Sequence, residues 1–253
     1  MTNNLPSVDI ILPNYNSSEF LSETLNSIFN QNFENWNLII IDDNSDEKTR
    51  DILKKINNDK VKIIWLKKNK GQGFCRNLAL RYYCKSDYVS FIDSDDLWKK
   101  SKLEEQINFM KENDIDFSYT PYEIVKSGNN KFVKNINVPL KFNFKSFIGN
   151  TSIATSSMIL KNGLSKKAKF TKTRSCDDYY YKCKLLKQIK YAYCFNQTLT
   201  TYRIRPGSVQ SNRLRNLFLV WKINRNLNKF SFFKSLVSLV SISFNSFKKY
   251  GLR

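Results

Sequence analysis

Short runs of β-branched and aromatic residues alternate with longer segments of helical spacing through the first half of the chain. The runs are predicted strands, at residues 8–13, 36–41, 61–66, 87–92 and 115–120. The segments between them place apolar residues three or four positions apart, which is the spacing of one helix face. The clearest predicted helices are those around the stripe of Phe20, Leu21, Leu25 and Ile28, around residues 78–82, and over residues 103–114. This alternation predicts an α/β fold, with βαβ units around a buried, mostly parallel sheet.

The regular alternation ends near residue 120. Pro121, Gly128, Asn129, Asn130 and Pro139 interrupt the pattern that follows. Such turn-forming residues break a chain into irregular or antiparallel pieces. We therefore place a boundary after residue 120.

A second change of pattern begins at Arg213, and residues 213–253 carry nine basic residues and no acidic one. An apolar stripe with helical spacing runs through Phe232, Phe233, Leu236, Val237, Val240, Phe244 and Phe247. This pattern predicts an amphipathic helix. The stripe either packs on the protein's own core or rests on a membrane surface. We favour the membrane, because each Lys or Arg near an anionic leaflet contributes about 1 kcal/mol.

The net charge of +20 is unevenly distributed along the 253 residues. Residues 1–123 hold 20 acidic and 16 basic side chains, whereas residues 124–253 hold 26 basic and only 2 acidic ones, Asp177 and Asp178. The two halves therefore face different surroundings. A hydrophobic content of 41% is that of a globular protein.

Histidine is absent from the sequence, which excludes Ser-His-Asp hydrolases and His-ligated zinc sites. Proton transfer must therefore fall to carboxylates, Lys, Tyr or Cys. The five cysteines are odd in number and never spaced as C-x-x-C, so we interpret them as free thiols in a reducing compartment. We expect no secretory signal in "MTNNLPSVDI" and no membrane span, since no run of roughly 20 apolar residues occurs.

Polar clusters follow three of the predicted strands. Because the carboxyl ends of parallel strands meet at one edge of a sheet, where ligands bind, we expect one shared cleft. The clusters are Pro13, Tyr15 and Asn16; Asp42, Asp43, Ser45 and Asp46; and Asp93, Ser94, Asp95 and Asp96.

Asp93 and Asp95 are separated by one residue just beyond an apolar strand. Strand alternation would put both carboxylates on one side, where they could share a divalent cation that keeps positions open for phosphate oxygens. The alternative is the amino-terminal cap of a helix beginning in "DSDDLWKKSKLEEQI".

Asp42 and Asp43 also allow two interpretations. They could cap a helix that begins near Asp46. A carboxylate here could instead accept the N3–H proton of a uracil ring, by the logic of base-edge recognition. Tyr15 could then stack on that ring.

The segment "KGQGFCRNLAL", residues 70–80, places a Gly-x-Gly turn before a predicted helix that carries Arg76. A diphosphate requires close backbone approach and a permanent cation, and this segment offers both. It is neither a Walker loop nor a dinucleotide fingerprint, because the required Lys-Ser/Thr and third Gly are missing. The alternative is an ordinary surface arginine.

Asp177 and Asp178 in "SCDDYYYKC" could cap the following helix, whose positive end favours acidic side chains. The alternative is a general base that takes the proton of a substrate group. In a chain without histidine, a carboxylate kept ionised among Lys and Arg side chains is the leading candidate.

Six motifs together, in this order and spacing, resemble the family 2 glycosyltransferases, which have the single Rossmann-like GT-A fold. They cover residues 7 to 215 or so and read "ILPNYN", "IIIDDNSDEKT", "NKGQGFCRNLAL", "FIDSDDLW", "CDDYYYKCKLL" and "YRIRPGSVQSN". The run that starts at "DSDDLW" is most similar to enzymes of bacterial surface polysaccharides such as teichuronic acid or lipopolysaccharide outer chains. A sugar nucleotidyltransferase is the nearest competing enzyme class, but its amino-terminal Gly-rich loop is absent.

The resemblance implies a role for each matching residue. Pro13 and Tyr15 would frame the uracil and Asp43 accept from it, with Arg76, Asp93 and Ser94 completing the nucleotide site. Asp95 and Asp93 would bind Mn²⁺ or Mg²⁺, Asp95 more firmly, and Asp178 would be the catalytic base. Residues implied near the diphosphate or acceptor are Asp96, Asp177, Tyr202 and Arg203.

The resemblance also implies that three segments of the chain have different roles. Residues 1–120 would bind the nucleotide sugar, residues 121–212 the acceptor, and residues 213–253 would form the basic helical tail. The predicted reaction is inverting transfer from a UDP-sugar to a hydroxyl of a lipid-linked saccharide or of a lipopolysaccharide or capsule precursor. The enzyme would work in the cytoplasm, peripherally on the inner face of the bacterial membrane.

Two alternatives stay open. One is a glycosyltransferase using a different nucleotide sugar. The other is a basic nucleic-acid-binding module, which the pI near 9.7 permits. We expect no nucleic-acid partner, because the basic half shows no recognised binding motif and the acidic clusters would repel a phosphate chain.

Overall fold

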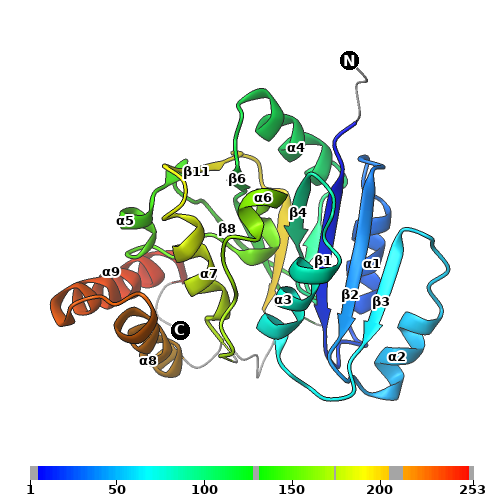
Figure 1. Ribbon diagram of the computed structural model, residues 1–253, viewed down its shortest axis with the longest axis horizontal. Coiled ribbons are helices and arrows are strands. Elements are labelled where there is room, and N and C mark those ends of the chain that lie inside the picture. The colour runs from blue at the N-terminus through cyan, green and yellow to red at the C-terminus, as the bar shows by residue number, and fades with distance from the viewer. Residues whose placement is uncertain (1–4, 128–130, 174, 205–212, 251–253) are drawn as a thin grey trace.

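The computed structural model describes residues 5–127, 131–173, 175–204 and 213–250. Its centre is an eight-stranded sheet flanked by helices (Figure 1). The strand order is β3 (Val61–Trp65), β2 (Trp36–Asp42), β1 (Val8–Asn14), β4 (Tyr88–Phe91), β10 (Ile159–Lys161), β6 (Phe117–Tyr119), β11 (Ala192–Cys194) and β9 (Lys141–Phe142). The predicted α/β fold class is confirmed.

The four strands β3, β2, β1 and β4 are mutually parallel. Every residue of β1 is buried, which explains why its sequence is an apolar run without alternation. The predicted strands lie within two residues of the observed ones at each end. The largest difference is at residues 115–120, where only Phe117–Tyr119 form β6.

Strands from the second half of the chain complete this sheet. β10 pairs antiparallel with both β4 and β6, and β11 pairs parallel with β6. A smaller sheet has the order β5 (Leu97–Trp98), β12 (Thr200–Ile204), β7 (Tyr122–Lys126) and β8 (Phe132–Ile136). The antiparallel pieces predicted beyond residue 120 include the β7–β8 pair.

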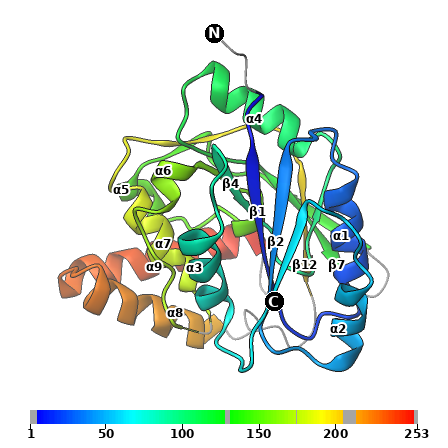
Figure 2. The same cartoon turned by 45° about the vertical axis from the view of Figure 1, so that its right-hand side comes forward.

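Helices cover both faces of the large sheet (Figure 2). On one face, α1 (Leu21–Phe29), α2 (Glu47–Lys54) and α4 (Lys102–Glu112) contribute to one apolar cluster. On the other face, α3 (Gln72–Tyr82), α6 (Asn162–Ser165) and α7 (Asp177–Leu185) contribute to a second, together with α5 (Phe144–Phe147). A short 3₁₀ turn, Thr155–Ser157, precedes β10.

The C-terminal segment is helical, as predicted, with α8 (Arg213–Lys222), a π-helical turn (Ile223–Leu227) and α9 (Phe232–Tyr250). These helices lie beside α7 (Figure 1). The interpretation that the apolar stripe of α9 packs on the core is wrong, because all seven of its side chains are exposed. Within the described ranges, no helix combines the length and apolarity that crossing a bilayer demands.

Candidate functional site

The carboxyl ends of β1, β2 and β4 form the predicted edge. Asn14 at the end of β1 is paired in register with Asp42 at the end of β2, and its side-chain amide donates to the Asp42 carboxylate at 2.9 Å. The polar residues that follow these strands are therefore brought together, as the parallel arrangement requires. Asp42 is buried and also accepts from the backbone N–H of Ser45.

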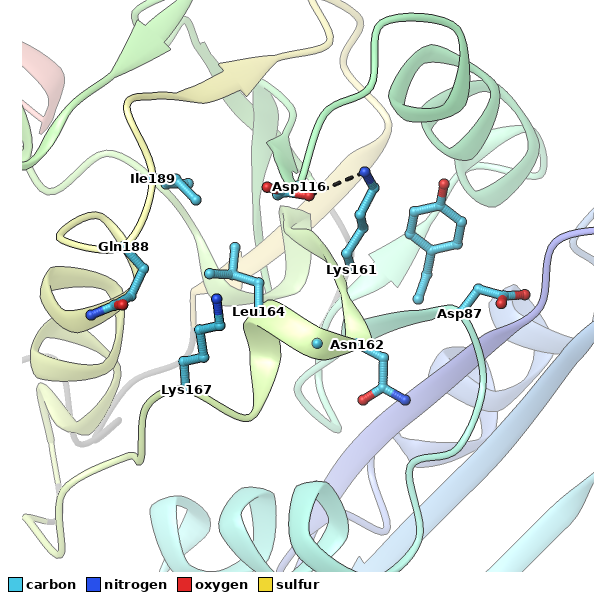
Figure 3. A pocket seen from close by; sticks show the side chains of 10 residues that line it. Asp87, Asp116, Lys161, Asn162, Leu164, Lys167, Gln188 and Ile189 are labelled. Atoms are coloured by element: carbon cyan, nitrogen blue, oxygen red, sulfur yellow. Dashed lines mark ion pairs between the residues drawn. The ribbon is translucent and has the colours of Figure 1, made fainter.

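The hollow drawn in Figure 3 lies at the opposite edge, beside Asp87 and Tyr88 at the amino end of β4. Its volume is about 540 Å³. Asp116 in its wall is paired with Lys161 at 3.1 Å, and Asp87 accepts from the backbone and hydroxyl of Ser7. Because these carboxylates are engaged and none of the motif residues lines the hollow, we place the candidate site at the carboxyl edge instead.

Asp43 fixes the loop that leads into α3. Its two carboxylate oxygens accept from the backbone N–H groups of Lys70 and Gly71, each at 2.7 Å. The interpretation of Asp42 and Asp43 as helix caps is wrong, because Asp46 caps α2 by accepting from the N–H of Thr49. Asp43 thus ties the end of β2 to the Gly-x-Gly turn.

The acidic residues after β4 lie in a turn rather than in a strand. The expectation that strand alternation puts the Asp93 and Asp95 carboxylates on one side is therefore wrong. The turn also does not cap a helix, since α4 begins only at Lys102. Asp96 is buried and accepts from the Ser156 hydroxyl at 2.5 Å and the backbone N–H of Arg203 at 3.1 Å. Burial, with Asp95 and Asp93 close by, raises its pKa well above the ordinary value.

Arg76 is the centre of the site. The interpretation of Arg76 as a surface residue is wrong, because its side chain is buried. One guanidinium nitrogen donates to Asp93 at 2.5 Å and another to Asp177 at 2.8 Å. A single cation therefore joins the acidic turn after β4 to the amino end of α7, which are 84 residues apart in the chain.

The junction of α3 with α7 requires a glycine at position 73. A Cβ atom there would lie 2.4 Å from the Thr171 carbonyl oxygen and 3.1 Å from a carboxylate oxygen of Asp177. Asp177 accepts from Gln72 and Arg76, so its oxygens face α3, and it is not the helix cap that we had considered. Burial outweighs the attraction of Arg76 and raises the pKa of Asp177 to about 6.

Asp178 is held differently from its neighbour. One of its oxygens, Oδ2, accepts from the Thr155 hydroxyl at 2.8 Å and from the Lys182 ammonium at 2.5 Å. Its side chain is 31% exposed, whereas that of Lys182 is 2% exposed. Burial opposes ionisation, but the charge and hydrogen bond of Lys182 outweigh it and lower the pKa of Asp178 to about 2. Asp178 is thus an ionised, partly accessible carboxylate.

The remaining predicted residues lie in β1, in the turns that follow β1 and β4, and in β12. Pro13 and Ser94 are buried, and Tyr15 is 49% exposed. Tyr202 in β12 contacts the ring of Tyr122, and Arg203 is buried and donates to Glu23 at 2.8 Å. The end of the "YRIRPGSVQSN" motif, residues 205–212, lies outside the described residues.

Sequence reasoning missed several contributors to this site. Ser156 joins the acidic turn by donating to Asp96 and accepting from the N–H of Asp93. Thr155, next to it, contacts Asp178. Only Lys182 left a signal, because it follows Asp178 by four residues on one helix, the spacing at which opposite charges meet.

A metal ion could be held here only with help from a ligand. Among the residues that the structure describes, no three acidic or Cys side chains are grouped so that they could hold a metal ion. Mg²⁺ and Mn²⁺ commonly use one or two carboxylates and take their other ligands from water and phosphate. Asp93 and Asp95 fit that pattern, with a nucleotide diphosphate supplying the rest.

The sequence model of Glycosyl transferase family 2 matches residues 9–191. This range contains every candidate site residue named above except Tyr202 and Arg203. The chain belongs to this family.

Two relatives align with most of this chain. The chain is 32% identical over 251 residues, covering 98% of this chain and 99% of the relative, to a Bacillus subtilis (strain 168) protein assigned to teichuronic acid biosynthesis as glycosyltransferase TuaG. It is 31% identical over 218 residues, 85% and 84% of the two chains, to WfgD of Escherichia coli, a UDP-Glc:alpha-D-GlcNAc-diphosphoundecaprenol beta-1,3-glucosyltransferase. The family match and these two relatives, each aligned over most of its length, make the chain a glycosyltransferase.

Solved structures share the fold. Residues 1–349 of S. aureus TarS, in complex with UDP-GlcNAc, superpose with a TM-score of 0.74 at 21% identity, over 96% of this chain and 73% of that chain. The mannosyltransferase PcManGT of Pyrobaculum calidifontis, in complex with GDP-Man and Mn²⁺, gives 0.63 at 14% identity, over 94% and 70%. The predicted GT-A fold is confirmed.

Proposed function

We propose that this glycosyltransferase moves a sugar from a UDP-sugar to a hydroxyl of a lipid-linked saccharide, with inversion at the anomeric carbon. The observation that carries the proposal is Arg76, which joins Asp93 of the nucleotide-side turn to Asp177, the neighbour of Asp178. This connection brings a diphosphate-side cluster and an accessible, ionised carboxylate to one edge of the sheet. The UDP-Glc and diphosphoundecaprenol in the name of WfgD support the donor and acceptor classes.

The proposed reaction is a single displacement. The acceptor oxygen forms a bond to the anomeric carbon while the bond from that carbon to the diphosphate oxygen breaks. Asp178 accepts the proton of the acceptor hydroxyl, and the electron pair of the broken bond leaves on UDP. A divalent metal, held by Asp93 and Asp95, would offset the charge that develops on the leaving diphosphate.

Tyr15, Pro13 and Asp43 are the proposed uracil site, and Ser94 lies in the acidic turn beside it. Asp43 already accepts two backbone hydrogen bonds, but a carboxylate has about four lone-pair positions and can accept a further hydrogen bond from uracil N3–H. Asp96, Asp177, Tyr202 and Arg203 are proposed to support the diphosphate or the acceptor. The alternative is a donor with another nucleotide, such as the GDP-Man that is bound to PcManGT.

We expect UDP to bind only in the presence of Mn²⁺ or Mg²⁺, and Asp95→Ala to abolish this dependence, because it removes a metal ligand. Isothermal calorimetry with Mn²⁺ and with EDTA measures both effects. Asp51→Ala, which removes an exposed carboxylate of α2 paired with Lys54, is the matched control. Equal UDP affinity with Mn²⁺ and with EDTA would contradict the proposed metal site.

Lys182 sets the basicity of Asp178, so Lys182→Met should raise the pKa of Asp178 from about 2. In the parent enzyme, the lowered pKa keeps Asp178 ionised down to low pH. In the variant, the higher pKa of Asp178 should move the acid limb of the pH–rate profile to higher pH. UDP release measured across pH tests this shift. Lys184→Met, which removes a basic residue from the same helix, should leave the acid limb in place. An unmoved limb in Lys182→Met would exclude Asp178 as the titrating base.

A lipid-linked acceptor places the reaction at the cytoplasmic face of the membrane, and we propose that the basic tail attaches the enzyme there peripherally. We also propose that residues 1–120 bind the donor, residues 121–212 bind the acceptor and residues 213–253 form the tail, as the resemblance to the family implies. Nucleic-acid binding is not proposed, because the site assembles acidic carboxylates at the edge that a phosphate chain would have to approach.

A further inference from the structure

Helix α9 has its polar face turned toward the protein. Ser235 and Ser238 are buried. The Ser238 hydroxyl donates to the carbonyl oxygen of Ile148 at 2.7 Å, and the Asn245 amide donates to that of Gly149 at 2.9 Å. The helix is therefore attached through these hydrogen bonds and through Ile242, which is buried in the core, while most of its large apolar side chains are not used for packing.

The opposite face of α9 is apolar and exposed. Phe233, Val237 and Phe244 are 77%, 64% and 68% exposed. Helix α8 and the turn after it extend this surface, because the ring of Trp221 contacts that of Phe232 with centroids 5.3 Å apart. We call the exposed set the apolar platform: Leu214, Phe218, Leu227, Phe232, Phe233, Leu236, Val237, Val240, Phe244 and Phe247. Contiguous exposed apolar surface of this kind marks an interaction site.

The charges around the apolar platform are all of one sign. No acidic residue occurs after Asp178. Among the described residues, six exposed basic side chains belong to the helices of the platform and the turns between them: Arg215, Lys222, Arg225, Lys229, Lys234 and Lys248. A partner must therefore combine an apolar interior with an anionic surface. A second copy of this chain would bring two such basic surfaces together, and like charges repel.

We propose that the apolar platform is a docking face for an anionic lipid bilayer, lying in the interface with its aromatic and aliphatic side chains below the headgroups. This inference rests on the proposed membrane-borne acceptor and identifies the surface that meets the membrane.

The platform is joined directly to the helix that carries Asp178. Ser175 donates to Asn216 of α8 at 2.9 Å, and Tyr179 of α7 donates to Asn224 at 2.9 Å. Asn224 in turn donates to Ser238 of α9 at 3.0 Å. Docking of the platform thus fixes the orientation of α7 relative to the bilayer, and with it the direction from which a lipid-linked acceptor reaches Asp178.

Deleting the tail would be a poor test, because it would strip these buried hydrogen bonds from α7. The better variant is the triple substitution Phe233→Ser, Val237→Ser and Phe244→Ser, which changes only exposed side chains. Phe132→Ser with Leu140→Ser is the matched control, since these side chains are 54% and 64% exposed but lie outside the tail.

Flotation is measured with phosphatidylcholine vesicles with and without phosphatidylglycerol. We expect the parent and control proteins to float with the anionic vesicles and to be released by salt. The triple variant should partition at least about tenfold less, since three apolar side chains no longer leave water. The UDP affinity of the triple variant should be unchanged. Flotation therefore tests the proposed docking face, and UDP affinity separately tests the proposed donor site.

Three outcomes would overturn the inference. One is a parent protein that stays with the soluble fraction, and another is a triple variant that floats as well as the parent. The third is a parent dimer, seen by light scattering, that the triple variant converts to a monomer, because a second copy would then occupy the platform.

Discussion

Replacing Asp178 by Asn is expected to slow sugar transfer by about 100-fold or more, the size of a general-base contribution. The amide can still accept from Thr155 and Lys182 through its oxygen, so the shape of the site is kept while the basicity is lost. UDP affinity should be nearly intact, because Asp178 lies on the acceptor side of Arg76. Turnover is measured as UDP release with extracted membranes as the acceptor source.

The control for this variant is Asp116→Asn, which changes a carboxylate at the opposite edge of the sheet (Figure 3). It should leave turnover unchanged. An Asp178→Asn enzyme as fast as the parent would remove Asp178 from the base role. A product that retains the donor's anomeric configuration would contradict the single displacement itself.

The second large effect concerns stability. Arg76→Met should lower the free energy of unfolding by about 3–5 kcal/mol, because it leaves the buried Asp177 and the partly buried Asp93 without their cation. Urea denaturation measures the loss. Lys54→Met removes a solvent-exposed ion pair with Asp51 instead, and should cost at most about 1 kcal/mol.

The loss in Arg76→Met should depend on pH. The folded-state pKa of Asp177 is about 6, raised by burial above the ordinary 3.8, and removing Arg76 raises it further. A group with a raised folded pKa favours the folded state at low pH and loses that contribution as pH rises through the folded value. The deficit of the variant should therefore shrink between about pH 8 and about pH 5. A deficit that is constant over this range would mean that Asp177 is not the group left uncompensated.

The central strands could be predicted because burial on both faces requires uninterrupted apolar runs, as in Ile10, Ile11 and Leu12 of β1. β10 and β11 could not, since three residues are too few to show a period. Their positions depend on pairing with β4 and β6, which are distant in sequence.

The site was predicted at the level of residue types and less well at the level of contacts. Polar residues at strand ends follow from topology, so Asp43 and Asp93 could be placed at one edge. The burial of Arg76 could not be foreseen, because a helical arginine is usually exposed. Its charge is compensated by Asp93 and by Asp177, and Asp177 lies 101 residues further along the chain. The same holds for the C-terminal helices. The spacing of Phe233, Val237 and Phe244 predicts an apolar helix face, but it does not show whether that face packs on the protein or is exposed.

The position of β10 between β4 and β6 has a consequence for how the chain folds. A fragment ending at residue 120 would contain β4 and β6 without the strand that separates them, and each would present an open edge to other molecules. The donor half should therefore aggregate when produced alone and become soluble only when residues 121–204 are supplied with it. The proposed boundary between donor and acceptor segments should thus not be a boundary of cooperative unfolding, because β10 must be synthesised before the first half can complete its sheet.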